Sequence, residues 1–549
     1  MDYKKVYKNW LNNDFFDQAT RDELKNIEND ENEIEDRFYQ ELAFGTAGLR
    51  GKLGAGTNRM NNYTVSKATQ AFADTIIEMG ADAKERGVTI CYDVRHKSEE
   101  FSKISAEIFV ANGIKVNIYK DIQPTPVCSY TIRKLNSIAG VMITASHNPR
   151  EYNGYKAYGS DGSQILEDIA VKIQDHMKEY DDYSKIKRMN FDDAMSKGLI
   201  NWVEDSVIED YVKEILYCTI NEDVDKEVKI VYTPLNGCGN KLVRRILDER
   251  GFKNIYVVDK QENPDPDFTT VGYPNPEDPK AFKLSEELGK EKDAQLLLAT
   301  DPDSDRCAVE VRDENGEYQF LTGNQIGSLL TNYILTALKE NDQLSEDGAI
   351  VKSIVSTDLV KPIAKSFDIE VYEVLTGFKN IYEIANKFEK NGKGEFIFGF
   401  EESIGYNYKD FVRDKDAVNS AMLISEMTAY YKNKGQSLLD VLEDIYNKYG
   451  YYSNEVQSIV LEGLDGANKI KRIMESIRNN PIGKVANLEV ESIIDYQNDD
   501  TGLSKSNVLK YYLEDNSWFV LRPSGTEPKI KLYINAIDES KEKAEIKKN

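Results

Sequence analysis

The sequence repeats one arrangement of strands and helices three times, and this repeat limits the fold to a series of α/β domains. In each copy, three short apolar runs alternate with two segments of helical periodicity. The predicted strands are 88–94, 114–119 and 137–144, then 229–234, 254–259 and 294–300, then 349–356, 369–375 and 395–400. The predicted helices start near Ser98 and Val127, near Gly239 and at 279–290, and near Asp358 and at 379–390. Each copy is therefore βαβαβ, which predicts a mostly parallel or mixed sheet covered by helices.

Each third strand runs directly into a polar loop. These loops read TASHNP at 144–149, DPDSDR at 301–306 and EESIGY at 401–406. Parallel strands joined by helices place ligand-binding loops beyond the carboxyl ends of the strands. We therefore expect all three loops to take part in function, whereas the Pro-rich stretch at 263–279 is predicted only as a loop of the second copy.

The C-terminal part of the chain has a different pattern. A helix is predicted at 437–448, followed by strands near 455–461, 508–513, 517–522 and 529–536, which favours a smaller α+β domain. A chain of 549 residues is also too long for one hydrophobic core. The predicted domains are 1–206, 207–321, 322–445 and 446–549.

Composition narrows the possible partners and the cell compartment. The net charge of −25 argues against nucleic acid, because binding a phosphate backbone needs a basic surface. There is no apolar run of ~20 residues to span a membrane and no signal-peptide pattern at the start. The five scattered cysteines favour reduced thiols, so we expect a cytoplasmic protein. An acidic protein that binds an anion must concentrate positive charge locally.

The segment Asp301–Arg306 carries the clearest chemistry. Asp301, Asp303 and Asp305 alternate along a segment that we expect to be extended, so their carboxylates would project to one side. Such hard oxygen ligands suit Mg²⁺, Mn²⁺ or Ca²⁺. An EF-hand is excluded, because its Gly and Glu positions hold arginines here, and three histidines in the whole chain nearly exclude a His-rich site. The alternative, an acidic surface turn, is disfavoured because three repelling carboxylates follow a buried strand.

The role of Ser146 stays open on local sequence alone. A serine in the turn after a strand can be a nucleophile, but it can equally cap a turn that ends in Asn-Pro. His147 is adjacent, yet neighbouring side chains are expected to diverge, and the GxSxG elbow of hydrolases is absent. Lys156, ten residues further on, can serve as a proton-transfer group or a phosphate ligand.

Two further loops leave alternatives open. Glu401, Glu402 and Ser403 offer acceptors and donors for sugar hydroxyls, but Glu is also favoured in the first turn of a solvated helix. The segment RPSGTEPK at 522–529 combines Arg, hydroxyls and Gly, which is typical of a phosphate-binding loop. Its alternative is a simple hairpin loop.

Taken together in this order, the motifs resemble those of the α-D-phosphohexomutase family, particularly its phosphoglucomutase branch. The resemblance spans nearly the whole chain: FGTAGLRG (44–51), TASHNP (144–149), NGYKAY (153–158), DPDSDR (301–306), LTGFKN (375–380), GFEESIGY (399–406) and RPSGTEPK (522–529). Any one motif could arise by chance, whereas the ordered set is specific. The resemblance implies four domains around a central cleft, the first three sharing an α/β topology, in agreement with the repeats.

The resemblance also implies roles for individual residues. Ser146 would be the residue that is phosphorylated, and Asp301, Asp303 and Asp305 would bind one Mg²⁺ together with an oxygen of that phosphoserine. Arg50 and Lys156 would lie near the catalytic centre, with Lys156 as general acid or base, and Arg306 would lie beside the metal. The residues implied in substrate binding are Arg306, Thr376, Gly377, Lys379, Glu401, Ser403, Arg522, Ser524, Gly525 and Thr526.

The implied activity is an intramolecular phosphotransfer that interconverts glucose 1-phosphate and glucose 6-phosphate, with glucose 1,6-bisphosphate as intermediate and activator. The expected partner is a small sugar phosphate, and a monomer is compatible with the sequence. Phosphopentomutase and phosphomannomutase are alternatives within the family. Phe400 departs from the commoner GEES form and resembles a pentose-phosphate branch, whereas Ser403 favours glucose and the absence of His from 376–378 disfavours mannose. A catalytically silent sugar-phosphate-binding paralogue is the non-enzyme alternative, although Ser146 and the three aspartates are all present.

Overall fold

The computed structural model describes residues 2–45, 48–461, 463–485, 487–524 and 529–548. The chain divides into two units. One unit comprises the residues up to Phe320 together with Gly405–Ala429, and the other comprises Leu321–Ile404 together with the residues from Tyr430 onward. Within the described ranges, no helix combines the length and the apolar character needed to cross a membrane.

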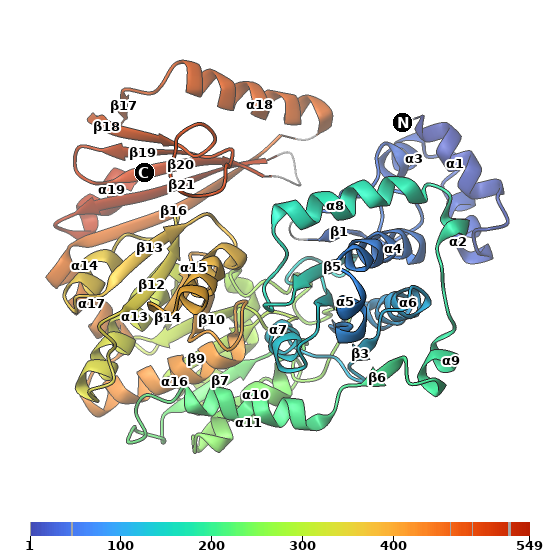
Figure 1. The fold of residues 1–549 in the computed structure, drawn as a ribbon. Coiled ribbons are helices and arrows are strands. Elements are labelled where there is room, and N and C mark those ends of the chain that lie inside the picture. Colours follow the sequence, from blue (N-terminus) through green and yellow to red (C-terminus); the bar gives the residue numbers. More distant parts are fainter. Residues whose placement is uncertain (1, 46–47, 462, 486, 525–528, 549) are drawn as a thin grey trace. The chain divides into compact units, whose positions relative to one another are not determined.

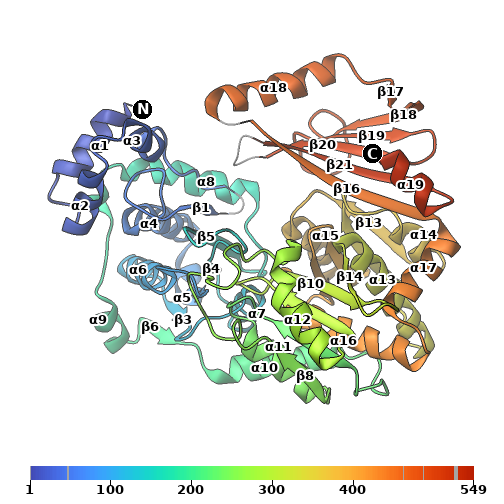
Figure 2. The ribbon, with the colours of Figure 1, turned by 180° about the vertical axis from the view of Figure 1, so that it is seen from behind.

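The first sheet of the first unit has six strands in the order β1-β5-β4-β2-β3-β6. Their bounds are β1 Leu49–Lys52, β2 Val88–Tyr92, β3 Val116–Ile118, β4 Ala139–Ile143, β5 Tyr152–Gly159 and β6 Ile200–Trp202. The strands β4, β2, β3 and β6 run parallel, while β5 is antiparallel to both β4 and β1. Figures 1 and 2 show the sheet between α4 (Asn62–Glu78) and α6 (Ser98–Ala111) on one face and α7 (Thr125–Lys134) on the other.

The second sheet of this unit has five strands in the order β11-β10-β9-β7-β8. Their bounds are β7 Lys229–Thr233, β8 Asn254–Val257, β9 Leu296–Thr300, β10 Cys307–Arg312 and β11 Tyr318–Leu321. The strands β8, β7 and β9 run parallel, and β10 returns antiparallel to β9. The turn between β9 and β10 is the aspartate segment, so a hairpin holds it at both ends.

Helices cover both sheets of the first unit. Their bounds are α1 Tyr3–Asn12, α2 Gln18–Asn26, α3 Glu31–Phe38, α4 Asn62–Glu78, α5 Ala81–Arg86, α6 Ser98–Ala111, α7 Thr125–Lys134, α8 Glu167–Met177, α9 Phe191–Ser196, α10 Asp205–Tyr217, α11 Asn240–Glu249 and α12 Lys283–Lys292. The strand β15 (Gly405–Tyr408) and the first part of α16 (Ala417–Asn433) also belong here. The N-terminal helices, which the sequence reading did not predict, form an apolar cluster of their own with Trp10 and Phe38 from the helices and Phe16 from the connection between α1 and α2.

The third βαβαβ copy lies in the second unit. The strands β12 (Gly348–Ser353), β13 (Glu370–Val374) and β14 (Glu395–Glu401) run parallel, with β12 between the other two. The helix α15 (Phe378–Asn391) buries Phe378, Ile381 and Tyr382 against them. The remaining helices of this part are α13 Gly323–Glu340, α14 Val360–Lys365 and α17 Leu438–Tyr449.

The C-terminal part of the second unit is an antiparallel sheet in the order β16-β21-β20-β19-β18-β17. The bounds are β16 Tyr451–Val460, β17 Lys484–Val485, β18 Leu488–Asp495, β19 Leu509–Leu513, β20 Trp518–Pro523, β21 Lys529–Asp538, α18 Gly463–Asn479 and α19 Lys541–Lys548. The helix α18 lies along one face of this sheet and buries Ile470 and Met474 against it (Figure 1). Trp518, Val520 and Tyr533 pack with Ile354 and Val355 from the loop after β12.

The fold class predicted from the sequence is confirmed: three α/β copies are followed by a smaller α+β part. Every strand predicted in the three copies is present, with shifted ends. The 263–279 stretch is a loop, as expected, ending where a short 3-10 helix begins at Pro279. The sequence reading missed β5, β10 and β18, and it placed no helix at α4, α13 or α18.

Candidate active site

Ser146 lies in the loop between β4 and β5, residues 144–151, which we call the serine loop. Its backbone is in the left-handed region, with φ 53°, and its amide donates to Thr144 Oγ1 at 2.8 Å. The residue is 4% exposed. A non-glycine residue in this conformation is uncommon and is retained when the surroundings over-determine it, which occurs often at functional sites.

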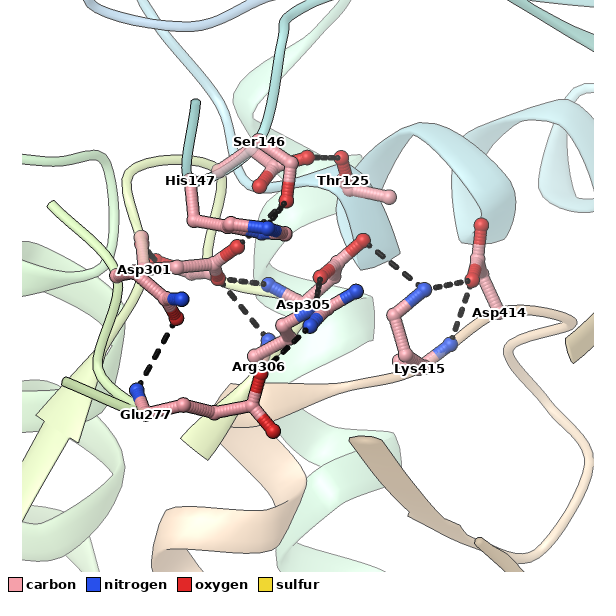
Figure 3. Close-up of polar contacts among 12 residues, drawn as sticks. Thr125, Ser146, His147, Glu277, Asp301, Asp305, Arg306, Asp414 and Lys415 are labelled. Atoms are coloured by element: carbon pink, nitrogen blue, oxygen red, sulfur yellow. Dashed lines mark hydrogen bonds and ion pairs between the residues drawn. The ribbon is translucent and has the colours of Figure 1, made fainter. Parts of the chain in front are cut away.

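The side chain of Ser146 faces the aspartate turn of the second sheet. Its Oγ donates to Asp301 Oδ2 at 2.8 Å and lies 3.2 Å from His147 Nδ1 (Figure 3). The expectation that Ser146 and His147 diverge was therefore wrong, because the left-handed backbone at Ser146 turns both side chains the same way. Burial and the guanidinium groups of Arg306 and Arg50 keep the pKa of His147 well below its usual value.

The segment Asp301–Asp305 is a turn rather than the extended segment that we expected. The amide of Ser304, with φ 52°, donates to the carbonyl of Asp301 at 2.9 Å and so closes the turn. All three aspartates are almost fully buried, and one carboxylate oxygen of each lies within 4.8 Å of the others. In a strand, every second side chain would lie on the same face. Here the turn of the backbone brings the three carboxylates to one side instead.

Several donors neutralise these carboxylates. Lys156 Nζ lies 2.8 Å from Asp303 Oδ2 and 3.2 Å from Asp305 Oδ2. Lys415 Nζ lies 3.1 Å from Asp305 Oδ2 and also pairs with Asp414 at 3.2 Å (Figure 3). Thr125 donates through Oγ1 to Asp303 Oδ2 at 2.7 Å. The two lysines therefore offset part of the negative charge of the aspartate turn beside Ser146.

The protonation of the aspartates follows from these contacts. Burial, with Asp303 and Asp305 as neighbours, raises the pKa of Asp301 well above its usual value. Burial alone would raise the pKa of Asp303 as well, but Lys156 and Thr125 hold it below its usual value. For Lys156, burial acts to lower the pKa, but the attraction of Asp303 and Asp305 outweighs it, so the pKa is raised above its usual value.

The aspartate turn fits a divalent cation. Asp301 Oδ1 accepts from the amides of Asp305 and Arg306, at 3.1 and 3.0 Å, so that carboxylate is held in place. Among the described residues, the buried Oδ1 atoms of Asp303 and Asp305 accept no hydrogen bond. Buried carboxylate oxygens without donors are costly, and hard oxygen donors are what Mg²⁺ prefers. The described part of the chain holds one such group of carboxylates, and it is this one.

The two predicted arginines, Arg306 and Arg50, both act electrostatically on His147, the residue after Ser146. Arg306 directly follows the aspartates, and its Nη1 lies 3.5 Å from Glu277 Oε2. Arg50 is on β1, opposite Gly154 of β5, and its Nη1 donates to Asn148 Oδ1 at 3.4 Å. Both therefore belong to the surroundings of Ser146. The first two residues that follow Gly45 in the predicted motif at 44–51 lie outside the described residues.

The sugar-binding residues predicted in the third copy lie together in the second unit. Glu401 ends β14, is 8% exposed, and its Oε1 accepts from the amide of Gly377 at 2.6 Å. Gly377, with φ 112°, precedes the first turn of α15, which contains Lys379. The alternative helix start at Glu401–Ser403 was wrong, because the chain there forms a turn between β14 and β15. Thr376 accepts from Asn380 Nδ2 through its carbonyl at 2.9 Å.

The predicted phosphate loop joins β20 to β21, so the hairpin alternative and the loop prediction are compatible. Arg522 pairs with Lys531 across the two strands, and its Nη1 donates to Tyr533 Oη at 3.4 Å. Ser524 donates from its amide to the carbonyl of Lys529 at 2.8 Å. Gly525 and Thr526 lie outside the described residues.

Sequence reasoning missed Thr125, Lys415 and Arg95. Thr125 begins α7, whose Pro-Thr-Pro start was a visible turn signal. Lys415 lies in the run RDKD at 413–416, where every residue is buried. Burial of four consecutive charged residues is rare without partners, but the sequence alone does not reveal that burial. Arg95 follows β2 and contacts the serine loop.

Family models match four successive regions of the chain. They are described as phosphoglucomutase/phosphomannomutase α/β/α domain I at residues 41–184, domain II at 209–316, domain III at 322–449 and the C-terminal domain at 470–549. The matches follow the order of the three α/β copies and the α+β part.

Curated relatives and solved structures agree with these matches. Phosphoglucomutase of Staphylococcus aureus (strain N315) is 37% identical over 537 residues, which cover 95% of this chain and 94% of that protein. Phosphoglucomutase of Staphylococcus haemolyticus (strain JCSC1435) is 35% identical over 91% of each chain.

The fold is similar to the open form of Paramecium pp63/parafusin, a phosphoglucomutase, with a TM-score of 0.70 at 19% identity over 91% of this chain and 92% of that one. It is also similar to a phosphoglucomutase/phosphomannomutase family protein of Burkholderia thailandensis, with a TM-score of 0.66 at 17% identity over 92% and 94% of the two chains. The chain therefore belongs to the phosphoglucomutase/phosphomannomutase family of phosphohexomutases, enzymes of the isomerase class.

Proposed function

We propose that this enzyme is an α-phosphoglucomutase that interconverts glucose 1-phosphate and glucose 6-phosphate. The observation that carries the proposal is the hydrogen bond of 2.8 Å from Ser146 Oγ to Asp301 within a turn of three buried carboxylates. The relatives named phosphoglucomutase, 37% identical over 95% of the chain, support glucose as the sugar.

In the proposed cycle, Ser146 carries the phosphoryl group. The P–O bond of phosphoserine breaks as a hydroxyl of the hexose monophosphate attacks, which yields glucose 1,6-bisphosphate and a free serine. The bisphosphate then presents its other phosphate, and Ser146 takes that group back. Because a phosphoryl group keeps its negative charge during transfer, catalysis consists largely of positioning and cationic stabilisation.

We propose that Asp301, Asp303 and Asp305 hold one Mg²⁺ together with an oxygen of the phosphoserine. When bound, this cation would supply positive charge that stabilises the transferring phosphoryl group. The proposal is supported by the two buried carboxylate oxygens, of Asp303 and Asp305, that accept no hydrogen bond from described residues.

The lysines and arginines around the turn have related proposed roles. Lys156, held by Asp303 and Asp305, would exchange the proton of the serine or substrate hydroxyl or bind the transferring phosphate. Arg50 and Arg306 would bind phosphate oxygens near Ser146. Their guanidinium groups suit bidentate contacts with phosphate.

Residues of the second unit are proposed to bind the rest of the substrate. Glu401 and Ser403, with Thr376, Gly377 and Lys379, would contact the sugar hydroxyls, and the contact of Glu401 with Gly377 supports treating them as one group. Arg522, Ser524, Gly525 and Thr526 would hold the phosphate that is not reacting. Phe400 gives no support to a pentose substrate, because it is fully buried against Gly327 and Phe398.

The proposed compartment is the cytoplasm, since the five cysteines are buried free thiols. Glucose specificity is tested by comparing kcat/KM for glucose, mannose and ribose 1-phosphates in the presence of Mg²⁺ and the matching bisphosphate. The proposal expects the highest kcat/KM with glucose 1-phosphate. A higher value with ribose or mannose 1-phosphate would reassign the substrate to a pentose or mannose phosphate.

A further inference from the structure

Arg95 contacts the backbone of the serine loop through its guanidinium group. It follows β2, and its side chain is completely buried. Its Nη2 donates to the carbonyl of Ser146 at 2.6 Å and also to that of Asn148, and its Nη1 donates to the carbonyls of Pro149 at 2.9 Å and Tyr152 at 3.1 Å. One guanidinium therefore gathers four carbonyl oxygens from the segment 146–152.

These contacts serve a segment that has no regular secondary structure before β5 begins at Tyr152. Buried carbonyls need donors, and a planar guanidinium offers five N–H groups in a fixed fork. A lysine at this position would offer three donors from a single nitrogen and could not span the same set of oxygens. The contact to the carbonyl of Ser146 also holds the residue whose left-handed backbone turns its hydroxyl toward Asp301.

Arg95 is itself held by its neighbours in the first sheet. Its Nε faces Asp93 Oδ2 at 3.4 Å, and its amide donates to Asp93 Oδ1 at 2.9 Å. Ser98 Oγ donates to that same oxygen at 2.7 Å. The guanidinium therefore forms a buried ion pair with a carboxylate whose other oxygen accepts two hydrogen bonds.

The 263–279 loop contacts the Arg95 guanidinium through Phe268. The ring of Phe268 lies 5.0 Å from the guanidinium carbon, and Phe268 is fully buried. The adjacent Asp267 is 3.0 Å from His96 Nε2 and 3.5 Å from Arg150 Nη1, so this loop contacts both the residue after Arg95 and the segment that follows Ser146. A ring over a guanidinium attracts it electrostatically and excludes water from it.

We propose that Arg95 is a positioning residue for phosphoryl transfer: by holding the four carbonyls, it fixes Ser146 Oγ in line with the transferring group. This inference rests on the proposed function of Ser146. Arg95 acts on the backbone of the serine loop rather than on the reacting hydroxyl, so its effect is on the rate of transfer rather than on substrate binding. The Phe268 loop contributes by keeping the guanidinium in place.

The test compares Arg95→Lys with a matched control, Arg59→Lys. Arg59 is another buried arginine of the first unit, 4% exposed, whose Nη1 donates to the carbonyls of Asp36 and Asn58 and whose Nη2 pairs with Asp36 Oδ2 at 2.5 Å. The measured quantity is the single-turnover rate at which Ser146 acquires phosphate from glucose 1,6-bisphosphate with Mg²⁺, read by intact mass after quenching. Thermal midpoints and KM for glucose 1-phosphate are recorded for each protein.

Arg95→Lys is expected to slow this phosphorylation about 100-fold, as for a reactive group displaced by roughly 1 Å. KM should stay within about threefold, because only positioning is lost. Arg59→Lys should retain the wild-type phosphorylation rate even if its thermal midpoint falls as much as that of Arg95→Lys. Should Arg95→Lys not fold, Phe268→Leu keeps the apolar cover without the ring face and should slow the step about tenfold.

The outcomes separate the two proposals. A wild-type protein that acquires no phosphate overturns the proposed function, and this inference with it. If the wild type is phosphorylated normally and Arg95→Lys is phosphorylated equally fast, the inference alone is overturned. If Arg95→Lys does not fold, an equally fast Phe268→Leu has the same consequence. Equal slowing in Arg59→Lys also overturns it, because the effect would then be one of general stability.

Discussion

For some residues of the site the residue type alone indicates the function, and for others it does not. Asp303 carries two oxygens with different surroundings: Oδ2 accepts from Lys156 and Thr125, while Oδ1 accepts no hydrogen bond from the described residues. Ser146 has no such signature, because its hydroxyl would suit a turn equally well. Its contact with Asp301 comes from a loop 155 positions away in sequence.

Asp303→Asn should therefore lower kcat about 100-fold or more while the protein stays folded, because the amide removes one anionic ligand and one repelling charge. Steady-state assays and a Mg²⁺ titration followed by calorimetry measure both effects. Asp416→Asn is the matched control, since Asp416 is fully buried and accepts from Tyr211 at 2.9 Å. Unchanged Mg²⁺ affinity in Asp303→Asn would refute the ligand assignment.

At the scale of elements, β5 decides where Lys156 lies. It is inserted between β1 and β4 and runs antiparallel to both, with Lys156 opposite Met142. This strand was missed in the sequence because it carries two glycines and no continuous apolar run, so its pattern reads as a loop. The strands that precede the three polar loops were predictable, since each is a largely buried and mostly apolar run.

Gly48→Ala should disrupt the pairing of β1 with β5. Gly48 has φ 75°, and a Cβ there would lie 1.8 Å from the carbonyl oxygen of Tyr155. Gly198→Ala is the control, because Gly198 has a similar φ of 66° but a Cβ added to it would meet no described atom within 4 Å. The control should lose about 1–2 kcal/mol of stability from backbone strain alone, and Gly48→Ala clearly more, measured by urea unfolding. Equal losses in the free energy of unfolding of the two variants would show that the contact between the added Cβ and the carbonyl of Tyr155 does not destabilise the protein.

The hairpin between β20 and β21 is the element proposed to hold the non-reacting phosphate. Arg522→Ala should raise KM for glucose 1-phosphate about 10–100-fold with a smaller change in kcat, because a charge-assisted contact made in both ground and transition states is lost. Lys484→Ala removes a cation from β17 of the same sheet and should leave KM unchanged. An unchanged KM in Arg522→Ala would remove the assignment of this loop.

For the whole molecule, the pH dependence of stability has an identifiable contribution from Glu310 on β10. Glu310 is 3% exposed, and burial raises its pKa from 4.5 to about 8, with Glu286 adding to the effect. When the pKa of a carboxyl is higher in the folded state, its contribution to stability is fully present at a pH below its unfolded-state pKa. That contribution is lost as the pH rises toward the folded-state pKa of about 8. Glu310→Gln should remove this loss and make the protein about 3–4 kcal/mol more stable than wild type at pH 8, because each unit of pKa difference between the folded and unfolded states corresponds to about 1.4 kcal/mol.

The comparison is made by urea unfolding at pH 5 and pH 8. The two proteins should differ little at pH 5, where the carboxyl is close to its unfolded pKa, and most at pH 8. A stability difference that is the same at both values would mean that Glu310 is not the titrating group.

What the sequence could predict for the whole molecule is set by the range of the interactions involved. The repeat, the polar loops and the aspartates are local patterns, and they gave the fold class and a carboxylate group that the structure brings together. Lys415, Thr125 and Arg95 reach the site through long-range packing, so no local pattern marks them. The aspartate segment shows the limit most clearly, since the turn at Ser304 depends on contacts that only the folded hairpin provides.

The central claim, that Ser146 carries the phosphoryl group, is tested most directly by intact mass. Wild-type protein incubated with glucose 1,6-bisphosphate and Mg²⁺ should gain one phosphate per chain, and Ser146→Ala should gain none. EDTA should prevent the gain in the wild type. A wild-type protein that gains no phosphate, or a Ser146→Ala variant that gains one, would contradict the claim.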